Sequence, residues 1–243
     1  MSEPYRDDNL LDRVSRPETL ELHYDRERER EAELIRRRLG RTGGDVLSVG
    51  CGWHPGRHLF PKPDWRMTGV ELDEAIPRHL VEAGVLDHGL AGQAGELPLA
   101  DESFDVVLYR LVLHHVVFQG PLAGAFAEAA RLLRPGGALV AVEPGSRHPV
   151  GAGLALANRL GLGPVVHGTP DDIPLSPRRL VEEARRAGLE TELHAVTYGW
   201  RRLPRAGQRA LQALDPLGSR PRLAPFGHTL MLIATRPPSS RSG

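Results

Sequence analysis

The spacing of hydrophobic residues along the chain changes near residue 45. Before that point, residues 18–39 combine a few leucines with the charged run from Asp25 to Glu33, which predicts a helix with a mostly solvated surface. After that point, short apolar runs alternate with helical patterns, as is typical of βαβ units. The apolar runs predicted as strands buried on both faces, as in a parallel sheet, are residues 45–50, 67–72, 104–109 and 138–143.

Helices are predicted between these strands, at residues 74–83 and 122–133, and a weaker strand near residues 89–93. The second helix ends at Arg134-Pro135-Gly136-Gly137, because proline cannot continue a helix and glycine can turn the chain.

Beyond residue 144 the pattern is less regular. Ser176-Pro177 opens a predicted helix that Gly188 closes, and residues 191–198 and 229–235 are predicted strands. Residues 144–175 and 199–227 are predicted to be long connections, of the kind that is often functional.

Composition and charge narrow the class of protein. The chain has 243 residues, of which 40% are hydrophobic and 26% charged, which fits one ordinary globular domain. No window approaches the roughly 18 apolar residues of a membrane helix, and the first residues lack the order of a signal peptide, so we expect a cytoplasmic protein with no membrane partner. The single cysteine, Cys51, excludes an internal disulfide and a cysteine-based zinc site.

Net charge gives no argument for a polyanionic partner, because 31 basic residues balance 31 acidic ones. Nucleic-acid binding is therefore not expected. The arginine-rich segment 201–222 keeps an RNA or protein substrate open as an alternative.

A ligand site is predicted where the first two strands end. Gly50-Cys51-Gly52 directly follows the first strand, and doubly wound sheets bind ligands at the carboxyl ends of their strands. Glu71 ends the second strand 19 residues after Gly52, a separation at which a carboxylate can accept hydrogen bonds from ribose hydroxyls. The alternatives are a simple turn at the glycines and, for Glu71, a surface acid that caps the next helix. A dinucleotide fingerprint fails, since Pro55 stands where its third glycine belongs.

Four blocks extend this pattern over about a hundred residues. They are VLSVGCG at 46–52, TGVELDE at 68–74, GELPLADESFDVVLYRLVLHHV at 95–116 and EAARLLRPGGALVAVEP at 128–144. In order and spacing they resemble the class I S-adenosylmethionine-dependent methyltransferases, in particular the small-molecule group that includes quinone-biosynthesis C-methyltransferases.

The resemblance implies an α/β fold. It is a doubly wound, seven-stranded, mostly parallel sheet of the Rossmann-like methyltransferase type, whose last strand is antiparallel. We expect this domain at residues 40–236, after an N-terminal helical segment at 1–39 and before a disordered tail at 237–243.

The resemblance also implies how S-adenosylmethionine is held. It assigns the glycine-rich turn of Gly50, Cys51 and Gly52 to the methionine portion, and Glu71 to the ribose diol. It assigns Leu72, Gln93 and Ala94 to the adenine. The backbone carbonyl of Arg110 is assigned to the amino group, and His115 to the methionine end.

Two departures from the family pattern leave a further alternative open. Trp53-His54-Pro55 lengthens the turn before Gly56, and Gln93 stands where the family usually has an acid. A cofactor-binding protein without transfer activity is therefore a second alternative to a small-molecule methyltransferase.

Methyl transfer is an in-line displacement, so the protein has mainly to align the acceptor with the methyl group. An acceptor that carries a proton must lose it, and histidine suits that step near neutral pH. His114 is the first candidate for the base and His148 the second, with a purely structural role as the alternative. No metal site is expected, because the pair His54 and His58 lacks a third ligand.

Overall fold

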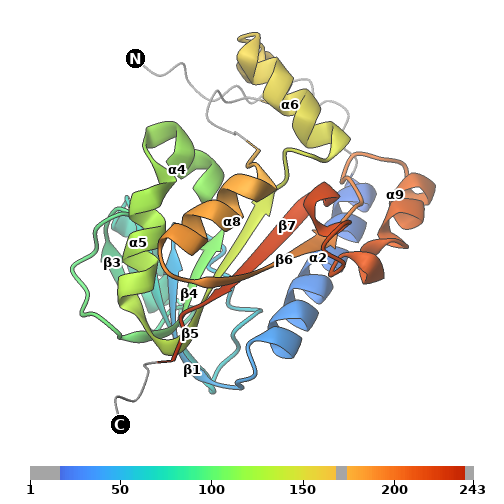
Figure 1. The fold of residues 1–243 in the computed structure, drawn as a ribbon. Coiled ribbons are helices and arrows are strands. Elements are labelled where there is room, and N and C mark those ends of the chain that lie inside the picture. The colour runs from blue at the N-terminus through green and yellow to red at the C-terminus, as the bar shows by residue number, and fades with distance from the viewer. Residues whose placement is uncertain (1–16, 168–173, 239–243) are drawn as a thin grey trace.

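The computed structural model describes residues 17–167 and 174–238 of the chain. Residues 1–16 of the predicted N-terminal segment and 239–243 of the predicted tail lie outside the described residues. Seven strands form one sheet in the order β3-β2-β1-β4-β5-β7-β6 (Figure 1). The strands are β1 (Gly44–Val49), β2 (Trp65–Glu71), β3 (His88–Ala91), β4 (Phe104–Arg110), β5 (Leu133–Pro144), β6 (Glu190–Thr197) and β7 (Thr229–Thr235).

Strand directions match the predicted fold. Strands β1 to β5 are parallel to one another, whereas β7 runs antiparallel to both β5 and β6. The chain order reverses between β1 and β4, which places a topological switch point at the carboxyl ends of these two strands. The predicted doubly wound sheet with a reversed last strand is confirmed.

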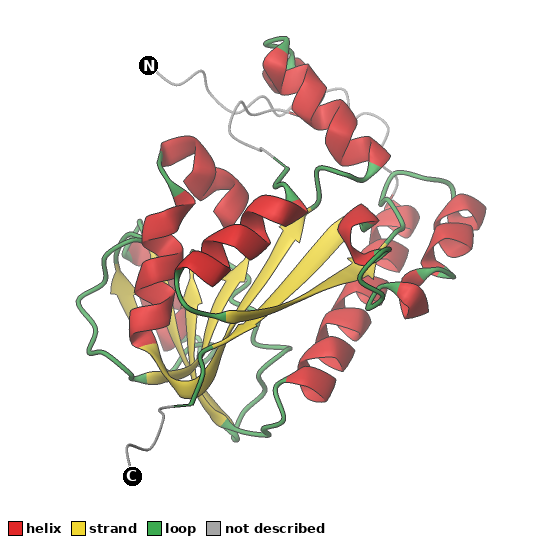
Figure 2. Ribbon diagram, in the orientation of Figure 1, coloured by secondary structure: helices red, strands yellow, loops and turns green. Residues whose placement is uncertain are grey.

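Helices cover both faces of the sheet (Figure 2). The helices are α2 (Pro17–Arg38), α3 (Ala75–Glu82), α4 (Leu113–Gln119), α5 (Leu122–Leu132), α6 (Pro149–Arg159), α7 (Gly163–His167), α8 (Pro177–Arg186) and α9 (Arg205–Gln212). Alternate strand residues serve two cores, because side chains along a strand point to opposite faces. In β4, Tyr109 packs on the side of α5 and α8, whereas Leu108 packs on the side of α2 and α3.

The two predicted long connections contain helices. Residues 144–175 include α6 and α7, and residues 199–227 include α9 and two short 3₁₀ turns. Helix α6 buries only Gly151 and leaves Leu156 exposed, as is Leu160 directly after the helix. It therefore lacks the buried apolar stripe by which a helix can be recognised in a sequence. None of the helices in the described residues is long and apolar enough to cross a membrane.

The prediction of a mostly solvated N-terminal helix is wrong for one face of α2. Thr19, His23, Glu27, Arg30 and Glu31 are buried together with two apolar residues one turn further on. These positions recur every three or four residues, which is the spacing of a single helix face. Polar side chains thus occupy the buried face that an apolar pattern would normally mark.

One ion pair ties this face to the end of β4. The Arg110 guanidinium donates to both carboxylate oxygens of Glu31, at 2.9 and 3.2 Å, and the Glu31 side chain is only 1% exposed. Such a pair is costly to break on one side, because the remaining charge stays buried without its partner.

We expect Glu31→Gln to lower the free energy of unfolding by about 3 kcal/mol, since it leaves the Arg110 charge uncompensated. Urea unfolding followed by circular dichroism measures this. Glu182→Gln is the matched control, because Glu182 pairs with Arg178 on the exposed surface of α8, and we expect no measurable change there. If the two variants had the same free energy of unfolding, the pair of Glu31 and Arg110 would not stabilise the fold more than a surface pair does.

Candidate functional site

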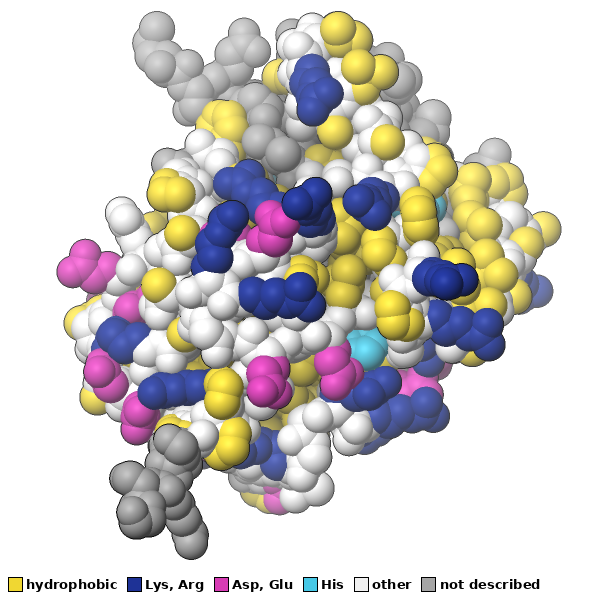
Figure 3. Space-filling view, in the orientation of Figure 1, with side chains coloured by type: hydrophobic (Ala, Val, Ile, Leu, Met, Phe, Trp, Pro, Cys, Tyr) yellow, Lys and Arg dark blue, Asp and Glu magenta, His cyan; other side chains and the backbone are white. Residues whose placement is uncertain are grey.

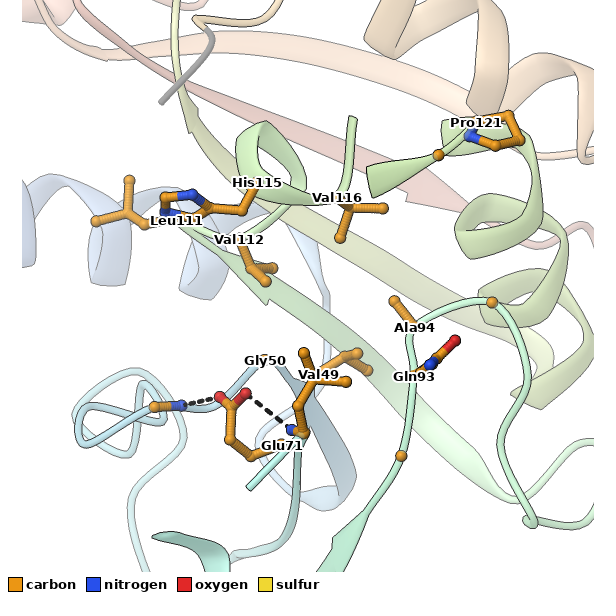
Figure 4. Close-up of a pocket in the computed structure, with 15 residues that line it drawn as sticks. Val49, Gly50, Glu71, Gln93, Ala94, Leu111, Val112, His115, Val116 and Pro121 are labelled. Atoms are coloured by element: carbon orange, nitrogen blue, oxygen red, sulfur yellow. Dashed lines mark hydrogen bonds between the residues drawn. The ribbon is translucent and has the colours of Figure 1, made fainter. Parts of the chain in front are cut away.

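A cavity of about 610 Å³ lies at the carboxyl ends of β1, β2 and β4 (Figure 4). Its wall comes from the turn after β1, the end of β2, the loop after β3, and the segment from the end of β4 to the start of α5. A volume of this size suits a small-molecule or cofactor ligand. The cavity therefore occupies the place at the switch point that the sequence predicted.

The glycine-rich turn has a shape that side chains would not permit. Gly50 has φ +63° and Gly52 has φ +45°, a region that glycine adopts readily. A Cβ atom on Gly50 would stand 2.2 Å from Cγ2 of Val112, so the close approach of these two segments requires glycine. On Gly52 a Cβ would meet no atom within 4 Å, which leaves that side of the turn open to a ligand.

Glu71 joins the turn to the end of β2. Its carboxylate accepts hydrogen bonds from the backbone N–H groups of Gly52 and Leu72, each at 2.9 Å (dashed in Figure 4). The helix-capping alternative for Glu71 is not what the structure shows, because Asp73 accepts the bond from Ala75 at the start of α3. Two N–H groups use only part of the acceptor capacity of a carboxylate, so Glu71 retains lone pairs for a ligand.

Seven of the nine predicted cofactor residues line the cavity. They are Gly50, Gly52, Glu71, Leu72, Gln93, Ala94 and His115. The inserted residues Trp53 to Pro55 are absent from the described lining, and Trp53 instead packs edge-on against His79 at a ring distance of 5.5 Å. The longer turn thus bends away from the cavity.

Cys51 and Arg110 do not line the cavity in the part of the chain that the structure describes. Cys51 is buried beneath the turn, where its N–H donates to the carbonyl of Val70. The side chain of Arg110 leaves the cavity for Glu31. The next residue, Leu111, has φ +57° and does line the cavity, so the chain turns sharply there.

His114 is held beside the cavity by a buried carboxylate. Its Nδ1 lies 2.6 Å from Oε2 of Glu143, and its ring centre lies 4.1 Å from that of His115. Glu143 also accepts from the backbone N–H groups of Val112 and Leu113 at 3.0 and 2.7 Å. His114 therefore stands directly behind His115, which lines the cavity.

Sequence reasoning missed Glu143 as a site residue. It is the last acid of the fourth sequence block and lies within a buried strand, with no exposed surface. A charged residue at the end of an otherwise apolar strand was the available signal, because a buried charge requires partners.

His148 lies in a different place, outside the described cavity lining. It caps α6, where its Nδ1 accepts from the N–H of Val150 at 3.3 Å. Burial lowers the pKa of the His148 imidazole. Its ring packs edge-on against that of His228, with 5.1 Å between the ring centres, so it contacts a group at the start of β7.

A second polar cluster was not predicted. His23, Glu27 and His228 offer ligand atoms within 4.8 Å of one another. The predicted pair His54 and His58 does not belong to this group, and His58 lies 3.7 Å from Glu31 instead. Only the folded chain reveals the cluster, because α2 and β7 are about 200 residues apart in the sequence.

Comparison with known proteins gives the class. Residues 47–141 match the family model described as a methyltransferase domain. A probable S-adenosylmethionine-dependent methyltransferase from Mycolicibacterium smegmatis is 31% identical over 173 residues, which are 67% of this chain and 59% of that protein. Residues 47–141 therefore carry a methyltransferase domain, and the chain is similar to S-adenosylmethionine-dependent methyltransferases over about two thirds of its length.

Other relatives agree on this class. A ubiquinone/menaquinone biosynthesis C-methyltransferase from Dinoroseobacter shibae is 37% identical over 103 residues, 40% of each chain. The chain spans less than two thirds of the length of these curated relatives.

Solved structures confirm the fold. A possible histamine N-methyltransferase from Thermotoga maritima superposes with a TM-score of 0.61 at 20% identity, covering 86% of this chain and 88% of that chain. A geranyl diphosphate methyltransferase, solved in complex with S-adenosylmethionine, gives a TM-score of 0.55 at 19% identity and covers 84% of each chain. The resemblance stated from the sequence blocks is confirmed.

Burial makes Cys51 a poor nucleophile. Desolvation and the nearby Glu71 carboxylate raise the pKa of the Cys51 thiol to about 12. Because the thiolate is the reactive form, we expect iodoacetamide at pH 8 to label the folded protein at least about 100-fold more slowly than the urea-unfolded protein. Mass spectrometry over time measures both rates. Rapid labelling of the folded chain would show that the turn opens and would contradict the buried position.

Proposed function

We propose that the protein transfers the methyl group of S-adenosylmethionine to an oxygen, nitrogen or carbon atom of a small-molecule acceptor. The cavity at the switch point carries this proposal, because its glycine turn and Glu71 come from the two strands that hold such a cofactor in this class. The small-molecule acceptor is favoured by the zero net charge and by the size of the cavity.

The residues present fit the cofactor. Glu71 has lone pairs left for the ribose diol, the open side of Gly52 admits the methionine portion, and Gln93 offers a side-chain carbonyl to the adenine amino group. The exposed side chain of Leu72 supplies apolar surface beside the adenine. We assign the amino group to the carbonyl of Arg110, directly before the sharp turn at Leu111.

When bound, S-adenosylmethionine would supply an activated methyl group, because its sulfonium leaves as the neutral thioether of S-adenosylhomocysteine and needs no acid from the protein. The protein therefore has mainly to align the acceptor with the methyl group, because two reactants held close together in the right orientation react readily. We assign removal of the acceptor's proton to His114. Glu143 faces Nδ1 of this ring, so that Nδ1 donates and Nε2 is the nitrogen that takes up a proton.

His148 is the second candidate for the base. Its Nδ1 is used to cap α6, where it accepts from the N–H of Val150. We place it at the acceptor end of the site as a packing partner of His228.

Two alternatives predict different measurements. An RNA methyltransferase that used the arginines of segment 201–222 would bind in a way that weakens steeply with salt. A cofactor-binding protein without transfer activity would bind S-adenosylmethionine and release no S-adenosylhomocysteine with any acceptor.

We expect Glu71→Ala to weaken S-adenosylmethionine binding by at least about 1 kcal/mol, roughly fivefold in Kd, because the ribose loses its acceptor. Isothermal titration calorimetry measures this. Glu74→Ala is the control, since Glu74 is exposed three residues further on and makes no side-chain cap on α3. Unchanged affinity of Glu71→Ala would remove Glu71 from the cofactor site.

Release of S-adenosylhomocysteine tests the transfer and the base together. The screen contains small phenols, amines and carbon acids, with bulk tRNA and a protein extract as competing acceptor classes. With an acceptor so found, we expect His114→Gln to lower kcat about 100-fold, because proton transfer to a placed side chain contributes at least that much.

His79→Gln is the control for that variant, because His79 is an exposed histidine near the turn. S-adenosylmethionine affinity should stay the same in both variants. An unchanged kcat in His114→Gln would assign the proton to another group, and release with tRNA alone would overturn the small-molecule proposal.

A further inference from the structure

The cluster of His23, Glu27 and His228 lies outside the cavity and beyond what methyl transfer requires. His23 and Glu27 stand one turn apart on the buried face of α2, and His228 directly precedes β7. The backbone carbonyl of His228 accepts from the N–H of Gly145 at 2.9 Å, which places the cluster at the carboxyl end of β5. It therefore joins the N-terminal helix to the far half of the sheet.

The spacing of these side chains suits a shared cation. Nε2 of His23 lies 3.3 Å from Oε1 of Glu27, and one ligand atom of each of the three residues lies within 4.8 Å of the others. Zinc bound tetrahedrally at about 2.0–2.1 Å separates its ligand atoms by roughly 3.3–3.4 Å. One pair already has this separation, and the ligand atom of His228 lies within 4.8 Å of both.

His23, His228 and Glu27 supply two imidazoles and one carboxylate, which is a ligand set found in zinc sites.

Neighbouring groups orient these ligands. The hydroxyl of Thr229 donates to Oε1 of Glu27, and Nδ1 of His228 lies 3.3 Å from the same hydroxyl oxygen. Metal ligands in proteins are held by such outer hydrogen bonds. A carboxylate oxygen has two lone pairs, so the bond from Thr229 leaves one for an ion.

We propose that His23, Glu27 and His228 bind one divalent transition-metal ion of the zinc type, with water in the fourth position. The ion fastens α2 to the start of β7. Three protein ligands and one open position give the tetrahedral coordination that zinc prefers. This proposal does not depend on the methyl-transfer activity, because none of its residues lines the cofactor cavity.

The test uses the full chain, freed of metal with a chelator and then titrated with zinc chloride by calorimetry. We expect one ion per chain. We also expect the thermal unfolding midpoint to rise by about 5–10 °C at a hundredfold excess over Kd. Cobalt(II) chloride added to the same protein should give the intense visible bands of tetrahedral coordination. Absence of saturable zinc binding, or cobalt bands of an octahedral aquo type, would overturn the proposal.

Variants separate this site from adventitious histidines. Glu27→Gln keeps the size of the side chain and one acceptor oxygen but removes the charge, and His228→Ala removes a ligand at a partly exposed position. We expect each variant to weaken zinc binding at least about 100-fold, since even outer-sphere changes cost 10- to 100-fold. His88→Ala, an exposed histidine on β3, should bind zinc like the unaltered chain.

Folding of each variant is checked by circular dichroism in the presence of chelator, where Glu27→Gln should match the unaltered protein. If Glu27→Gln and His228→Ala retain full zinc affinity while His88→Ala loses it, the ion is bound at the surface and the proposal is wrong. If zinc does not bind and His228→Ala is still destabilised, the cluster is a hydrogen-bonded network only, which also overturns it.

Discussion

The buried carboxylate of Glu143 fixes the wall of the cavity. It stands at the end of β5 with no exposed surface, and it binds the first N–H groups of α4 and the ring of His114. A carboxyl group in such a position is tolerated only when its hydrogen bonds are complete. The segment between β4 and α4 is therefore held in one conformation, and Val112 with it. Since Val112 lies against Gly50, the same carboxylate also determines how closely the glycine turn approaches.

Two carboxylates thus organise the carboxyl edge of the sheet in the same way. Glu71 at the end of β2 binds the turn after β1, and Glu143 at the end of β5 binds the segment after β4. Each strand end supplies an acceptor to the loop of its neighbour, which keeps the cavity formed without a ligand. A pre-formed site reduces the ordering that binding would otherwise require. Glu71 retains acceptor capacity toward the cavity, whereas Glu143 is fully used by the protein, so the two acids have different roles despite the same position on a strand.

The part of the fold nearest the cofactor could be predicted because its signals are local. The strands before Gly50 and Glu71 are continuous apolar runs, and the residues that follow them at the edge of the sheet have types that suit a ligand. Seven of the nine predicted cofactor residues line the cavity for this reason. The side chains of Cys51 and Arg110 turn away from the cavity into buried surroundings, a direction that the sequence does not give at the end of a strand. The roles expected for these two residues are backbone roles, which the direction of a side chain does not decide.

The buried face of α2 was beyond sequence reasoning for a different reason. Glu27 and Arg30 have partners 202 and 185 positions away, and Glu31 has one 79 positions away, so neither half of the pattern has meaning alone. Asp215, the one acid among the arginines of the last quarter, is completely buried. It accepts from Arg26 of α2 at 3.1 Å and from the N–H of Tyr198 at 3.0 Å.

Apolar surfaces in contact can slide past each other at small cost, but paired buried charges cannot, because a shift of one turn leaves each of them unpaired. The N-terminal helix is therefore held in one register against β6, β7 and the segment between them. Arg110 extends the same constraint to the end of β4, beside the cavity. The first helix and the last quarter of the chain thus act as one unit, which the Glu31–Arg110 pair links to the strand end beside the cavity.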